Sequence, residues 1–139
     1  MRAGNRFGSA WLAMGLFAVS LAASAEDVKF TLSGAQEVPA VTTEAKGEGT
    51  ITIAEDMSVT GNVTTTNVEG IAAHIHLAEA GKNGPPVITL TKGEGGTWST
   101  PAGARLTEEQ YKAFKAGHLY VNVHSAAHKG GEIRGQLQP

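Results

Sequence analysis

Apolar residues recur at every second position through most of this chain, and this alternation restricts the fold more than any other feature. Val28, Phe30 and Leu32 alternate with polar neighbours, and the pattern returns at Ile51 and Ile53. A period of two places successive side chains on opposite faces of a β-strand, whereas a helix needs a period of 3.6. The chain is therefore predicted to form strands with one face towards a core.

Further segments show the same pattern between clusters of turn residues. Strands are predicted at 59–63, 71–77, 87–91, around Trp98, 118–124 and 132–138, with a loop at 81–86. Seven or eight short strands without an internal repeat indicate one antiparallel β-sandwich or barrel.

A single short helix is predicted over residues 108–116. Thr107 and Gln110 have the spacing of a capping box, Leu106 and Tyr111 can form a hydrophobic staple, and Gly117 supplies the stop.

The first 25 residues are predicted to be a signal peptide. Arg2 and Arg6 give a positive start, residues 10–22 are apolar, and Ala23-Ser24-Ala25 is a small-residue cleavage site. The mature domain is then 26–139, exported to the periplasm or the extracellular space, with no membrane anchor after cleavage.

Composition restricts the chemistry. The chain has no cysteine, which excludes disulfides and thiolate metal sites. The formal net charge of -2 gives no basic excess for binding nucleic acid. No G-x-S-x-G nucleophile motif or phosphate-binding loop is present. The five histidines are the remaining source of recognisable chemistry.

Two of these histidines share one strand. In 71–77, Ile71, Ala73, Ile75 and Leu77 are predicted to face the core, and His74 and His76 the opposite side. Their Cβ atoms are then ~7 Å apart, within range for binding one metal ion. The alternative is that both are ordinary polar residues on a solvated outer face.

A third ligand is available at His124, on the non-core face of another strand. The site forms only if this strand lies beside that of His74. His118 is ~20 Å from His124 along an extended strand, so both cannot bind the same ion. His128 is predicted to point from its loop into water. His118 and His128 are therefore predicted to lie outside the site.

Three imidazoles suit copper or zinc, and the intrinsic affinity order favours Cu(II). Glu132 or a water is the candidate fourth ligand. Asn122, Tyr120 and Gln136 are candidates for orienting the imidazoles, with exposed polar positions as the alternative. Gln36 and Glu37 are expected to form a turn, with the organisation of a loop near the site as the alternative.

Four motifs in order resemble the CHRD domain, which is named from chordin, an extracellular antagonist of bone morphogenetic proteins. They are 32–39 (LSGAQEVP), 73–85 with A-H-I-H and G-K-N-G-P, 119–124 (LYVNVH) and 131–137 (GEIRGQL). The resemblance implies an immunoglobulin-like β-sandwich with a distant likeness to copper/zinc superoxide dismutases, but no established activity.

The dismutase likeness is partial. His74, His76, His124 and Arg134 are similar in kind and order to its copper ligands and a later arginine. However, no histidine lies between Leu77 and Gly117, so the zinc half has no counterpart. The cysteine pair is missing, and Arg134 is spaced differently, so the likeness does not extend to a substrate-guiding arginine.

The sequence therefore predicts an exported metal-binding domain, for copper in the first place, using His74, His76 and His124. Two alternatives remain: a copper enzyme similar to superoxide dismutase, ranked below binding, and a metal-independent extracellular module that binds a protein partner.

Overall fold

The alternating segments form antiparallel strands in the computed structural model, which describes residues 13–18 and 24–139. The elements are β1 (Ala25–Ser33), the 3-10 helix η1 (Gly34–Gln36), β2 (Lys46–Ala54), β3 (Val59–Thr66), β4 (Gly70–Leu77), β5 (Pro86–Thr89), β6 (Thr91–Lys92), β7 (Thr97–Ser99), α1 (Glu108–Lys115), β8 (Leu119–Ser125) and β9 (Ile133–Leu137). The predicted all-β sandwich with one short helix is confirmed.

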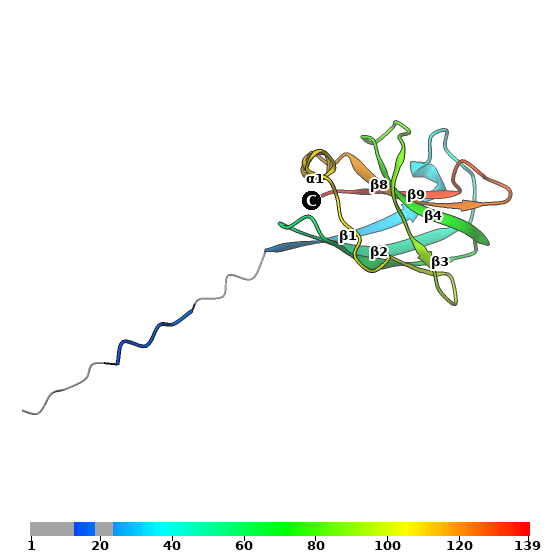
Figure 1. Cartoon of the computed structure of the whole chain (residues 1–139). Coiled ribbons are helices and arrows are strands. Elements are labelled where there is room, and N and C mark those ends of the chain that lie inside the picture. The colour runs from blue at the N-terminus through cyan, green and yellow to red at the C-terminus, as the bar shows by residue number, and fades with distance from the viewer. Residues whose placement is uncertain (1–12, 19–23) are drawn as a thin grey trace, which may run out of the picture.

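The strands form a nearly closed sheet in the order β5-β4-β8-β9-β1-β2-β3-β7-β6 (Figure 1). Its two ends, β5 and β6, are consecutive in the chain and are separated only by Leu90. β5 pairs with β4, β6 pairs with β7, and the Leu90 amide donates to the Ala73 carbonyl over 2.9 Å. One short segment therefore bridges the two ends of the sheet.

The core is made by the apolar half of each alternation. Val28 and Leu32 of β1 are 2% exposed, as predicted. The other strands add Ile51, Ile53, Val59, Val63, Ala73, Ile75, Trp98, Leu119, Val121, Val123, Ile133 and Leu137. Each large aliphatic side chain stabilises the fold by about 1.5–3 kcal/mol through burial.

The helix follows the predicted capping chemistry. The Thr107 hydroxyl accepts from the Gln110 amide, and the Gln110 side chain accepts from the Thr107 amide. Phe114 is fully buried, and Gly117 follows the helix with φ +78°. The capping residues and the glycine thus set the two ends of α1.

One predicted core residue was wrong. Ile71 is 59% exposed, because the register of β4 against β8 shifts between Gly70 and Ala72. A bulge of this kind interrupts the alternation of faces. Gly70 lies on the inner side instead, where a Cβ would come within 2.8 Å of Trp98.

The predicted signal peptide falls mainly outside the described residues, because 1–12 and 19–23 are not described. Met14, Leu16 and Phe17 are exposed, and Ala25 pairs with Ala54 in the sheet. Within 13–18 and 24–139, no helix has both the length and the apolar character needed to cross a membrane. Cleavage after Ala25 stays a prediction.

Candidate metal site

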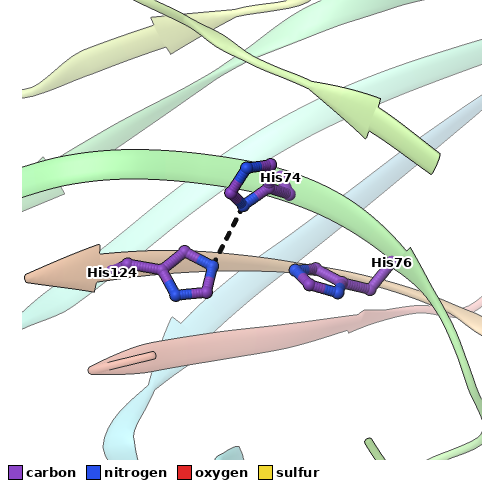
Figure 2. Close-up of side chains that lie close together, drawn as sticks. All are labelled: His74, His76 and His124. Carbon is purple, nitrogen blue, oxygen red and sulfur yellow. Dashed lines mark hydrogen bonds between the residues drawn. The ribbon is translucent and has the colours of Figure 1, made fainter. Parts of the chain in front are cut away.

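The pairing of β4 with β8 brings the three predicted histidines together. Ala72 lies opposite His124 and His74 lies opposite Asn122, so the adjacency that the sequence could only assume is present. Figure 2 shows the three rings side by side, His74 and His76 from β4 and His124 from β8. One nitrogen from each ring lies within 4.8 Å of the other two.

Backbone carbonyls fix which nitrogens of two of these rings carry a proton. His76 Nδ1 lies 2.9 Å from the Gly84 carbonyl oxygen, and His124 Nδ1 lies 2.8 Å from that of Lys129. A carbonyl only accepts, so both Nδ1 atoms carry the proton and both Nε2 atoms offer a lone pair. Metal-binding histidines commonly donate their second nitrogen in this way.

The nitrogen of His124 that carries no proton is contacted by His74. Its Nδ1 lies 3.0 Å from His124 Nε2, which is an acceptor, so His74 Nδ1–H donates to it. His76 Nε2, by contrast, is buried without any hydrogen-bond partner. An unpartnered buried acceptor costs free energy, and a metal ion would satisfy it.

The surroundings favour neutral imidazoles. Burial lowers the pKa of His74, and the neighbouring His124 and His76 lower it further. Burial also lowers the pKa of His76, against an opposing effect of the Gly84 carbonyl. Only a nitrogen without a proton can bind a metal, so lowered pKa values keep both ligands available at neutral pH.

The three histidines offer suitable ligand atoms for one metal ion, and the distances between their nitrogens are close to those that one ion requires. Bonds of ~2.0 Å place ligand nitrogens ~2.8–4 Å apart around one ion, so the 4.8 Å group would have to close by about 1–2 Å to bind it. Among the described residues, no acidic side chain joins this group. A fourth position is therefore left for water or another small ligand.

Tyr120 and Arg134 support His76 as a stack. The His76 and Tyr120 rings are parallel within 6°, with centroids 4.9 Å apart. The Arg134 guanidinium lies 3.5 Å from the centroid of the Tyr120 ring. Tyr120 and Arg134 are 2% and 1% exposed, although their strand positions predicted an outer face. Loops cover this face, forming a second, polar layer beside the apolar core.

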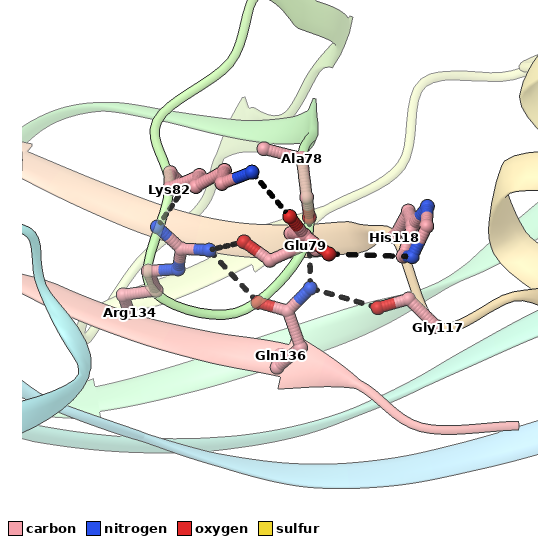
Figure 3. Close-up of polar contacts among 7 residues, drawn as sticks. All are labelled: Ala78, Glu79, Lys82, Gly117, His118, Arg134 and Gln136. Atoms are coloured by element: carbon pink, nitrogen blue, oxygen red, sulfur yellow. Dashed lines mark hydrogen bonds and ion pairs between the residues drawn. The ribbon is translucent and has the colours of Figure 1, made fainter.

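Arg134 and Gln136 hold one of these loops, residues 78–85, over the sheet (Figure 3). Arg134 donates to the carbonyls of Lys82 (2.7 Å) and Glu79 (3.1 Å) and to Gln136 Oε1 (2.9 Å). Gln136 donates to the carbonyls of Ala78 and Gly117.

The same loop carries the Gly84 carbonyl that orients His76. With its guanidinium buried and engaged, Arg134 positions this loop and has no exposed charge to attract a substrate. Gln136 shares that positioning role.

Glu132, the candidate fourth ligand, is engaged elsewhere. Its carboxylate accepts from the hydroxyls of Thr43 (2.8 Å) and Ser125 (2.7 Å). It therefore ties the segment before β2 to the end of β8 and is not brought into the histidine group.

The two histidines predicted to lie outside the site are apart from it. His118 is half-buried, and its Nε2 lies 4.0 Å from a carboxylate oxygen of Glu79. His128 occupies the loop after β8, where its amide donates to Ser125.

Sequence reasoning ranked a turn above a role near the site for Glu37 and did not predict that its carboxyl is buried. Glu37 is 5% exposed, and burial raises its pKa to about 7, against opposing effects of Asn122 and Arg134. Asn122, a predicted orienting residue, is 2% exposed and donates weakly, over 3.4 Å, to the Gly130 carbonyl. The only sequence signal for Glu37 was its place in the first motif, because loops carry no periodicity that marks a buried carboxyl.

Comparison with known proteins supports the family resemblance. The model of the family described as CHRD domain matches residues 28–137, which is most of the chain. Searches of the curated proteins and of the solved structures gave no match.

Proposed function

This chain belongs to the CHRD domain family, and from that premise we propose that it is an exported domain that binds one copper ion. The ligands are His74, His76 and His124. The observation that carries the proposal is the group of three imidazole nitrogens, two of which have their lone pairs directed by carbonyl contacts.

The donor set favours copper over other ions. Three neutral nitrogen ligands suit Cu(II) and Zn(II), and Cu(II) binds such ligands more tightly. Cysteine is absent from the chain, and Met57 packs against the apolar core. Zinc is the alternative occupant.

Export is supported by the N-terminal sequence and by the family. Residues 1–25 have the three parts of a signal peptide, and chordin, from which the family takes its name, is extracellular. A periplasmic or extracellular location also suits a site that takes up a metal ion from outside the cytoplasm.

Calorimetric titration of the mature domain with Cu(II), repeated with Zn(II), tests the proposal. We expect about one site per chain and a rise in thermal stability, since a ligand at 100 times its Kd adds about 2.7 kcal/mol. The His74→Ala/His76→Ala variant should lose the site, whereas His118→Ala, which removes a histidine outside the group, should keep it. Equal affinity of the double variant and the wild type would refute the proposal.

A catalytic role is the second candidate, because the metal position is accessible. His74 and His124 are only half-buried, and the histidine group leaves a coordination position for a small molecule. Superoxide dismutation is the reaction to test. A copper-loaded domain no more active than copper bound to a short histidine peptide would exclude it and leave binding as the function.

The same wild-type and variant proteins also test the alternative that the domain binds a protein partner without metal. A partner captured from envelope extract equally with and without chelator, by a domain that binds no copper, would favour this role over metal binding.

A further inference from the structure

Three buried polar atoms gather beside the histidine site without a hydrogen-bond partner. In the part of the chain that the structure describes, these unpartnered side-chain atoms are Glu37 Oε1, His76 Nε2 and Asn122 Oδ1. His76 Nε2 is assigned to the metal by the proposed function. The two oxygens are both acceptors when Glu37 is ionised, so neither can satisfy the other.

Asn122 lies between Glu37 and His76. Its side chain lowers the pKa of Glu37 and raises that of His76, so it is close to both groups. Gly131, with φ +124°, permits this approach, because a Cβ there would overlap both Glu37 Oε1 and Asn122 Nδ2. The backbone is thus shaped around this contact, and Asn122 connects the carboxyl to the metal position.

One proton accounts for both unpartnered oxygens. A neutral Glu37 can donate its proton to Asn122 Oδ1 once the amide has turned over, since its two ends are similar in shape, and this removes two unsatisfied acceptors at once. An ionised Glu37 can instead accept from the Asn122 amide nitrogen without any turning of the amide, because Nδ2 is the end that faces Glu37 Oε1. The pair is therefore compatible with two protonation states.

We propose that Glu37 and Asn122 form a proton-exchanging pair behind the metal site, and that metal binding at the histidines expels the proton of Glu37. This proposal rests on the proposed function. Burial favours the neutral carboxyl in the metal-free protein, whereas a divalent cation nearby favours the carboxylate. The released proton passes to solvent, and the carboxylate then offsets part of the charge of the metal.

One charged side chain lowers the pKa of Glu37, and two cavities adjoin its carboxyl group. Arg134 of β9 already favours the carboxylate, but not enough to overcome burial. A cavity of about 240 Å³ on one side of Glu37 is also lined by Asn83 and His128. A second cavity, on the side of loop 78–85, is lined by uncharged residues of that loop and by Arg134. These cavities give the proton a route to solvent.

Proton release can be counted by calorimetry with Cu(II) in buffers of different ionisation enthalpy. With a pKa of about 7, Glu37 is about half protonated at pH 7. The wild type should therefore release about half a proton more per bound Cu(II) than Glu37→Gln. Glu44→Gln, at an exposed position of the same loop, is the matched control and should release as many protons as the wild type.

The outcomes separate this proposal from the function on which it rests. Cu(II) binding with equal proton release from the wild type and Glu37→Gln would overturn the proton-exchanging pair alone. Absence of Cu(II) binding to the wild type would overturn both.

If Glu37→Gln fails to fold, the carboxyl carbon of Glu37 can be titrated by NMR in the wild type. Its pKa should fall by at least one unit when the diamagnetic Zn(II) is bound. An unchanged pKa in the loaded protein would overturn the proposal.

Discussion

Replacement of Arg134 by methionine tests whether the polar layer holds the metal site in place. Arg134 is 1% exposed and donates three hydrogen bonds, two of them to carbonyls of loop 78–85. It also lies against the face of Tyr120, which stacks on His76. Methionine keeps an unbranched apolar stem but removes the charge and every donor.

The magnitude follows from these contacts. Three hydrogen bonds from a charged group at about 1.5 kcal/mol each, with a cation–π contact of about 1.5 kcal/mol, give about 6 kcal/mol. Removing the cost of burying a guanidinium, and burying a methionine instead, offsets about half of this. We therefore expect the free energy of unfolding to fall by about 3 kcal/mol. For a domain of this size that lowers Tm by roughly 12 °C.

Urea and thermal unfolding of the metal-free domain give the stability, and Cu(II) titration gives the second readout. Loosening the loop frees the Gly84 carbonyl from His76, so Cu(II) affinity should fall by about tenfold or more. Arg105→Met is the control, because Arg105 is exposed and donates only to the Asp56 carbonyl. A loss at Arg134 below about 1 kcal/mol, or no greater than that at Arg105, would refute this account of the polar layer.

Two further predictions concern the contact between Glu37 and Asn122. Gly131→Ala should destabilise the domain by about 1–3 kcal/mol, because φ is +124° and the added Cβ overlaps both side chains. Gly130→Ala meets nothing within 4 Å, so urea unfolding that ranks the two variants equally would contradict this. Glu37→Gln should also flatten the pH dependence of stability. A pKa raised from 4.5 to about 7 means that the folded state binds the proton more tightly, so wild-type stability should fall as pH rises through this window. Parallel pH profiles of unfolding for the two proteins would contradict the assignment.

The strands and the helix could be predicted because their signals are local. Alternating apolar residues place Val28 and Leu32 in the core, and the capping pair Thr107 and Gln110 sets the start of α1. Ile71 departs from its pattern because the bulge between Gly70 and Ala72 depends on how β4 meets β8. A register shift of this kind leaves no periodic trace in the strand itself.

The candidate ligands could be chosen from the sequence, but their meeting could not. His74 and His76 share a face through a local rule, whereas His124 joins them only because β8 pairs with β4. The tertiary structure also gives different roles to two further candidates, the predicted orienting residue Tyr120 and the predicted fourth ligand Glu132. Tyr120 stacks on His76, while Glu132 is held by hydroxyls away from the group.

The sequence by itself therefore determined the strand content, most of the core-facing residues and the choice of the three histidines proposed as ligands, since each depends on neighbours along the chain. Only the tertiary structure decided that the outer face of β4, β8 and β9 is covered. Loops from distant parts of the chain bury Arg134, Asn122 and Glu37 there. Burial removes water from these polar groups, and it is this loss of hydration that raises the pKa of Glu37 and lowers that of His76.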